Sequence, residues 1–156
     1  MRKRMISNGP QGTLPTDAHW LNLESLAQVE LASEDSVHPA ESALIPGGSG
    51  WRAAEPGKQI IRLLFDQPQR ITRISLVFEE YERERTQEFV LLWSSDGGQS
   101  YQEVVRQQYH FSPPGTVREI ENYIVALDGL TTLELSILPE ISGGAACASI
   151  AQLRLR

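Results

Sequence analysis

The sequence predicts an all-β fold, a jelly-roll β-sandwich of about eight antiparallel strands, and two observations carry this prediction. Short runs that alternate apolar and polar residues recur along the chain, separated by Gly- and Pro-containing turns at the spacing typical of sandwiches and barrels. No long amphipathic helical pattern is present, which argues against a parallel α/β sheet. With 156 residues, 40% of them hydrophobic, the chain has the length and composition of one globular domain.

The chain divides into a leader, residues 1–16, and a single domain, residues 17–156. Gly, Pro and polar residues dominate the leader, which we expect to be flexible. Its basic start is not followed by the apolar segment of a signal peptide, so the sequence predicts a cytoplasmic protein. Asp17 is placed to cap a short helical turn over residues 19–21, because its carboxylate can accept hydrogen bonds from the free amides of a helix start.

Period-two alternation identifies the strands. It appears at residues 26–32 and 59–65, and most clearly at 70–78, where the shift between Ile71 and Ile74 predicts either a bulge or a strand that begins at Arg73. Further strands are expected at 88–93, 103–111, 117–127, 133–138 and 150–156.

One apolar run and two turn sequences add detail to the predicted strands. The run at 88–93 is continuous enough to predict a strand buried on both faces. The Asp96-Gly97 pair that follows predicts a hairpin, because such turns need a positive φ that glycine adopts at little cost. Asp128-Gly129 is expected to separate two further strands.

No constellation typical of an enzyme is present. His19, His38 and His110 are far apart, and none has a second ligand at metal spacing, so no zinc site is expected. The Gly-rich stretch at 47–50 lacks the features of a nucleophile elbow and of a phosphate-binding loop. The carboxylates between residues 79 and 84 predict a solvated face rather than an acid–base pair. The sequence therefore predicts a protein that is not an enzyme and has no cofactor.

The charge and hydropathy of the chain narrow the classes of partner. Fourteen basic and twenty acidic residues give a formal net charge of −6, so nucleic acid is an unlikely partner. No apolar run is long enough to span a bilayer. The oligomeric state does not follow from the sequence.

Trp51 and Arg52 form the first candidate binding pair. In a functional interpretation they line a ligand loop at the end of the sandwich, because tryptophan offers an apolar face and arginine a planar hydrogen-bonding fork. In the structural interpretation, which we favour, Trp51 closes the end of the sandwich and Arg52 pairs with Glu41 or Glu55.

The second candidate is a set of polar residues on two strands. Alternation places Arg106, Gln108 and His110 on one face of their strand, whereas Arg85 and Gln87 open a neighbouring strand. Such donors and acceptors beside aromatic rings suit the recognition of sugar hydroxyls. A structural network, in which Arg85 or Arg106 pairs with Glu79, Glu88 or Glu119, is an equally good interpretation.

Residues 29–101 resemble the discoidin, or coagulation-factor type C, domains of the galactose-binding-like superfamily. The resemblance rests on the order of a small-residue strand (29–33), a Pro-Ala-Glu loop, Gly50-Trp51, the strand pair 59–66 and 71–78, and a Ser-Asp-Gly hairpin that ends at Tyr101. It implies a galactose-binding-like sandwich, and the whole chain resembles stand-alone bacterial proteins of the carbohydrate-binding type. The implied function is a non-catalytic module for a small glycan.

Residues 34–41 and 51–58 are also similar to the N-terminal domain of the X-ray cross-complementing single-strand-break repair scaffold. This second resemblance implies an alternative function, an intracellular protein-interaction module. The superfamily's calcium site draws on an Asp-rich loop before the Trp, whereas the loop at 45–50 has no carboxylate, so structural calcium is possible but unsupported.

Overall fold

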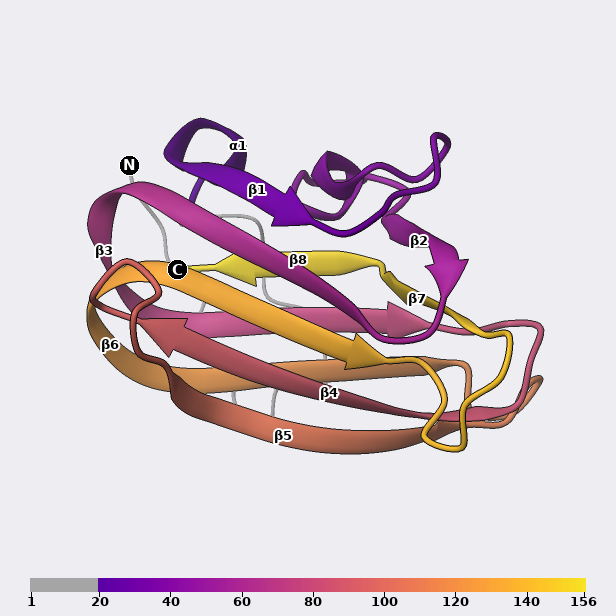
Figure 1. Ribbon diagram of the computed structural model, residues 1–156. Coiled ribbons are helices and arrows are strands. Elements are labelled where there is room, and N and C mark those ends of the chain that lie inside the picture. The colour runs from indigo at the N-terminus through magenta and orange to yellow at the C-terminus, as the bar shows by residue number, and fades with distance from the viewer. Residues whose placement is uncertain (1–19) are drawn as a thin grey trace, which may run out of the picture.

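The computed structural model describes residues 20–156, and these residues form an antiparallel β-sandwich, as the sequence predicts (Figure 1). The leader and the start of the predicted 19–21 turn lie outside the described residues. The eight strands are β1 (Ala27–Leu31), β2 (Trp51–Pro56), β3 (Gln59–Glu79), β4 (Arg85–Ser94), β5 (Gln102–Phe111), β6 (Arg118–Leu138), β7 (Cys147–Ile150) and β8 (Gln152–Leu155).

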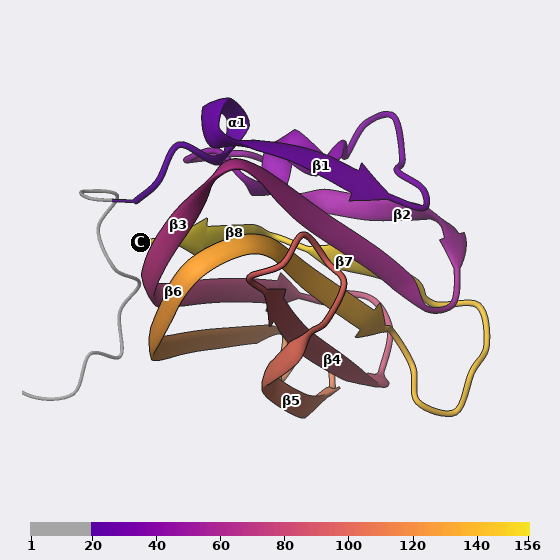
Figure 2. The same cartoon turned by 60° about the vertical axis from the view of Figure 1, so that its left-hand side comes forward.

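Two long strands, β3 and β6, build both layers of the sandwich. The first half of β3 pairs with β1 and with the second half of β6, whereas the second half of β3 pairs with β8 and with the first half of β6. β4 and β5 extend the first layer beyond β6, giving the order β1-β3-β6-β4-β5, and β2 pairs separately with β7. Figure 2 shows β3 and β6 bending together on one side of the molecule, where they pass from one layer to the other.

The bend corrects the prediction that turns divide β3 and β6 into separate strands. The pairing register of β3 with β6 shifts between Leu64 and Ile71, so the ladder bends there and continues. Gly129 has φ 72°, a conformation that glycine adopts without strain, and Asp128 forms an ion pair with Arg70 at 2.8 Å. The turn residues thus lie at a corner within each strand, because both halves still pair with the same partner.

Of the two alternatives predicted beyond Ile71, a strand that begins at Arg73 is wrong, because β3 is continuous there, and the register shifts between Ile71 and Arg73 as an irregular pairing requires. The predicted hairpin is confirmed: β4 and β5 pair in antiparallel fashion, and Gly97 has φ 74°. Within the turn, Ser94 Oγ and Ser100 Oγ donate hydrogen bonds to the carboxylate of Asp96.

A helical turn is present at α1 (Leu23–Leu26), where Asn22 provides the cap and accepts a hydrogen bond from the Ser25 amide at 3.3 Å, whereas Trp20 and Leu21 are not helical. The prediction for residues 88–93 is wrong. β4 is not buried on both faces: Phe89 and Leu91 face the core, whereas the alternate positions are half-buried. α1 and the short 3₁₀ turn η1 (Ala40–Ala43) are far shorter than a membrane span, and no described helix is long and apolar enough to cross a membrane.

The core between the layers is apolar and centred on two aromatic rings. Phe78 comes from the second half of β3 and Phe89 from β4, so each belongs to a different layer; both are fully buried, and their rings stack with centroids 5.0 Å apart. Contact between these rings ties the two layers together.

Replacing Phe89 by Ala is expected to lower the free energy of unfolding by about 3–5 kcal/mol, because the change removes buried apolar area and leaves a cavity. Urea unfolding measures this loss. Ile124→Ala is the control, since Ile124 is 83% exposed on β6 and its loss should change stability by less than about 0.5 kcal/mol. Equal effects of the two changes would contradict the assignment of Phe89 to the core.

Candidate functional site

The structure divides the seven sequence-predicted site residues into two groups by exposure. Three of them are almost fully buried, namely Trp51, Arg85 and Gln87. Four are exposed, namely Arg52, Arg106, Gln108 and His110. A side chain without exposed surface cannot contact a ligand unless the fold rearranges, so the two groups have different roles.

Trp51 packs in the core at the start of β2, in line with the structural interpretation. Its side chain is 1% exposed, and the indole Nε1–H donates a hydrogen bond to the Ser33 carbonyl at 3.1 Å. The ring is therefore an anchor that fixes the start of β2. It determines where the neighbouring Arg52 emerges at the surface.

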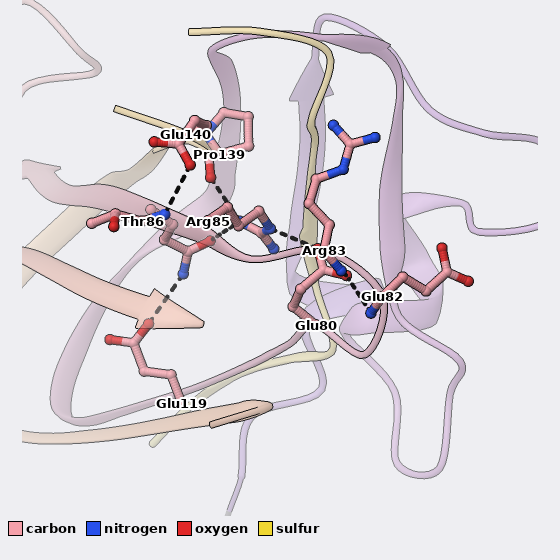
Figure 3. A network of polar contacts seen from close by, with 9 residues as sticks. Glu80, Glu82, Arg83, Arg85, Thr86, Glu119, Pro139 and Glu140 are labelled. Carbon is pink, nitrogen blue, oxygen red and sulfur yellow. Dashed lines mark hydrogen bonds and ion pairs between the residues drawn. The ribbon is translucent and has the colours of Figure 1, made fainter. Parts of the chain in front are cut away.

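Arg85 is the centre of a buried polar network at the start of β4 (Figure 3). Its Nε donates a hydrogen bond to Glu80 Oε1 at 2.7 Å, and its Nη1 donates to the Pro139 carbonyl at 2.9 Å and to Gln87 Oε1 at 3.2 Å. The guanidinium also lies 4.8 Å from the centre of the Phe111 ring, a favourable cation–π contact. Arg85 and Gln87 thus belong to a structural network, with Glu80 as the ion-pair partner of Arg85.

The network continues to a buried carboxyl group on β6. Gln87 Nε2 donates a hydrogen bond to Glu119 Oε1 at 3.1 Å, and Glu119 is 2% exposed. Burial, together with the neighbouring carboxylate of Glu121, raises the pKa of Glu119 to about 8. Glu119 is therefore mostly protonated at neutral pH, and the interior carries one negative charge fewer than the sequence suggests.

Arg106, Gln108 and His110 lie together on the outer face of β5, as alternation predicts. The register pairs them with Val90, Glu88 and Thr86 of β4. Arg106 lies 3.6 Å from Glu88 and 3.3 Å from Glu103, and His110 Nδ1 lies 2.7 Å from the Thr86 hydroxyl. These groups pair along a sheet surface, so their hydrogen-bonding capacity is partly used within the protein.

A cavity of about 260 Å³ opens at the end of the sandwich near the starts of β2 and β4. One wall carries His38 and Arg52, with Ser149 of β7 beside them. The opposite wall is the end of β3 and the loop that follows it. That wall presents Glu79, Tyr81 and Glu82, with Glu80 behind the loop. We call this cavity the end pocket.

Backbone hydrogen bonds fix the Arg52 wall of the end pocket. The Arg52 amide donates to the His38 carbonyl at 3.1 Å, and the Arg52 carbonyl accepts from the Asp35 amide at 2.8 Å. The Asp35 carboxylate closes the same turn by accepting from the Val37 amide at 3.0 Å. The guanidinium of Arg52 is exposed and forms no ion pair within residues 20–156, so the predicted partners Glu41 and Glu55 do not bind it.

Glu80 fixes the loop after β3, which forms the other wall of the end pocket. Besides the ion pair with Arg85, its Oε2 accepts hydrogen bonds from the amides of Glu82 at 3.0 Å and Arg83 at 3.3 Å. Partial burial acts to raise the pKa of Glu80, but the bonds from Arg85 and from the two amides hold this pKa below its ordinary value. The loop that carries Tyr81 is thus anchored to the Arg85 network.

Tyr81 is the exposed aromatic residue of the end pocket. Its side chain is 61% exposed, and its hydroxyl donates a hydrogen bond to Glu79 Oε2 at 2.8 Å. Glu79 in turn lies 3.5 Å from Arg118 of β6. An exposed ring with a restrained hydroxyl offers a flat apolar surface whose position varies little.

The sequence identified Arg52 and Trp51, which both line the end pocket, but not its other residues. Tyr81 lies within a run of charges that predicts an ordinary solvated face, and the sequence offers His38 no second ligand at metal spacing. A lone tyrosine among carboxylates is the one signal that points to this loop. Residues 20–156 contain no group of three or more His, Cys, Asp or Glu side chains placed to hold a metal ion.

No protein-family model and no curated protein sequence matches the chain. Solved structures do. The family 32 carbohydrate-binding module of NanJ from C. perfringens, in complex with galactose, is 14% identical with a TM-score of 0.63, and the match covers 87% of this chain and 96% of that one. The family 32 module of AlyQ, in complex with 4,5-unsaturated mannuronic acid, is 18% identical with a TM-score of 0.60 over 84% and 95% of the two chains.

A further match is an enzyme, the Ruminococcus gnavus family 29 fucosidase E1_10125 in complex with fucose. It is 8% identical with a TM-score of 0.64, and the match covers 86% of this chain but 26% of the fucosidase. Family 32 modules have the galactose-binding-like fold, so the predicted fold of this chain is confirmed.

Glu80→Gln is expected to lower the free energy of unfolding by about 3 kcal/mol, because it leaves the buried charge of Arg85 without its partner. Glu82→Gln, two residues away, is the matched control: Glu82 is exposed and forms no ion pair within the described residues, so its change should be nearly neutral. Chemical unfolding of both variants measures the difference. Similar stabilities would show that the ion pair is not structurally important.

Glu119→Gln is expected to raise stability at pH 7.5, by on the order of 2 kcal/mol. Folding raises the pKa of Glu119, so between its ordinary value and about 8 the unfolded state releases a proton that the folded state keeps, and stability falls as pH rises through this window. The amide substitution removes this loss. Thermal unfolding of wild type and variant from pH 4 to 8.5 should give curves that diverge as pH rises; parallel curves would contradict a protonated Glu119.

Proposed function

We propose that this chain is a non-catalytic carbohydrate-binding module and that it binds a glycan in the end pocket. The observation that carries the proposal is that exposed Tyr81 lines the same pocket as Arg52, whose guanidinium forms no ion pair within residues 20–156. The galactose-binding-like fold adds support, because the similar structures include family 32 modules with bound sugars.

The residues of the end pocket suit the chemistry of a sugar. A pyranose ring has an apolar face, which can pack on the ring of Tyr81, and hydroxyl groups around its edge that both donate and accept hydrogen bonds. Arg52 donates in a fixed planar fork, whereas Glu82 accepts, and His38 adds a further polar group. A ligand with alternating donors and acceptors is therefore better matched than an apolar one.

We favour the end pocket over the polar face of β5 because the charged side chains of β5 already pair with other residues of the protein. Arg106 is held by two carboxylates, and His110 lies against Thr86, whereas Arg52 has no such partner among residues 20–156. Binding at Arg52 therefore breaks no ion pair of the described residues. Nothing in the described residues favours the protein-interaction alternative specifically.

Arg52→Ala and Tyr81→Ala are each expected to weaken glycan binding at least about tenfold, which corresponds to about 1.4 kcal/mol, the scale of a hydrogen bond to a charged group. Both side chains are exposed, so the melting temperature should stay nearly constant. A glycan array identifies the sugar, and isothermal titration calorimetry then measures its dissociation constant.

Arg106→Ala is the matched control, since it removes an exposed arginine outside the end pocket. Loss of binding in Arg106→Ala but not in Arg52→Ala would move the site to β5. Absence of binding to any glycan of the array, with the protein folded, would contradict the proposed function and favour capture of a protein partner. Trp51→Ala is unsuited to this test, because the loss of a buried ring lowers stability.

A further inference from the structure

The end pocket has an uneven distribution of charge. Its loop wall brings three carboxylates together, those of Glu79, Glu80 and Glu82. The facing wall presents one guanidinium, that of Arg52, which forms no ion pair within residues 20–156. A ligand in the pocket therefore meets negative charge on one side and a single positive charge on the other.

Two of the three carboxylates already have cationic partners outside the pocket. Arg85 binds Glu80 at 2.7 Å, and Arg118 lies 3.5 Å from Glu79. Glu82 has no such partner in the described part of the chain. The charges that remain free to act on a ligand are thus one of each sign, Glu82 and Arg52, and together they leave the pocket polar but without spare positive charge.

This balance suits hydroxyl groups better than a ligand carboxylate. A hydroxyl donates to Glu82 and accepts from Arg52, whereas a carboxylate only accepts and is repelled by Glu82, whose charge forms no ion pair within residues 20–156. Each like-charge contact near 4 Å costs about 1 kcal/mol in water and more where water is partly excluded. The attraction of a ligand carboxylate to Arg52 is therefore offset by its repulsion from Glu82.

The size of the pocket limits how much of a glycan it holds. Its volume of about 260 Å³ lies below the range of about 300–1,000 Å³ typical of sites for drug-sized ligands. A pocket of this volume is matched to about one sugar residue of a glycan.

We propose that the end pocket selects a single uncharged sugar residue and discriminates against uronic acids. This inference rests on the proposed function and goes beyond it: similar structures hold both galactose and an unsaturated mannuronic acid, so the fold itself does not decide the charge of the ligand.

The experiment compares sugars that differ only in charge. Dissociation constants at pH 7 are measured by titration calorimetry for three stereochemically matched pairs, galactose and galacturonate, glucose and glucuronate, and mannose and mannuronate. In whichever series binds, the neutral sugar is expected to bind at least about tenfold tighter than the uronate. A uronate that binds as tightly as its neutral partner, or tighter, overturns this inference and leaves the proposed function intact. If no sugar of any series binds, both are overturned.

Glu82→Gln identifies the source of the discrimination. Removing the Glu82 charge should narrow the gap between neutral sugar and uronate several-fold, because it removes a repulsion from the uronate and gives the neutral sugar's hydroxyl a weaker acceptor. Glu55→Gln is the matched control, since it makes the same charge change on exposed β2 outside the pocket. An unchanged gap in Glu82→Gln, or an equal narrowing in Glu55→Gln, would show that the acidic wall does not set the preference.

Discussion

Arg85 carries a permanent positive charge into the interior of the sandwich, and much of the local structure follows from the need to neutralise it. A buried guanidinium without a partner costs several kcal/mol, so the fold must supply an anion and further acceptors. Glu80 supplies the anion, and the Pro139 carbonyl and Gln87 supply the acceptors. Because Glu80 also binds two amides of the loop after β3, the buried charge fixes the loop that forms one wall of the end pocket.

In the end pocket, some charged side chains are held in ion pairs within the protein, and others can bind a ligand. Arg118 and Arg85 form ion pairs with Glu79 and Glu80, and the Ser33 carbonyl accepts a hydrogen bond from Trp51. These groups therefore fix the walls of the pocket. Arg52 is left without an ion-pair partner among residues 20–156 because its backbone, not its side chain, carries the bonds that define the turn. Arg52 and Glu82, which form no ion pair among residues 20–156, supply the hydrogen-bonding charges of the proposed glycan site.

The second predicted site combined polar residues of two neighbouring strands, and the structure places these residues on opposite faces of the sheet. Alternation correctly assigned the faces of β5, but it could not tell which face of β4 looks inward, because Arg85 and Gln87 are residues that usually point to solvent. In the structure they point to the core and join Glu119, whose pKa is raised to about 8 by burial and by Glu121. Polar residues on a strand therefore indicate a binding site only where they are known to lie on the solvent-exposed face of the sheet.

By itself the sequence determined the fold class, most strand positions and the Asp96-Gly97 hairpin, because period-two alternation and turn residues are local properties of the chain. Tertiary structure alone decided that β3 and β6 continue through their corners. A turn residue ends a strand only where the segments on its two sides pair with different strands, and both halves of β3 pair with β6. Tertiary structure also decided which residues form the end pocket. His38, Arg52, Tyr81 and Ser149 come from segments far apart in the chain, and they lie together only because β2, β7 and the loop after β3 meet at one end of the sandwich.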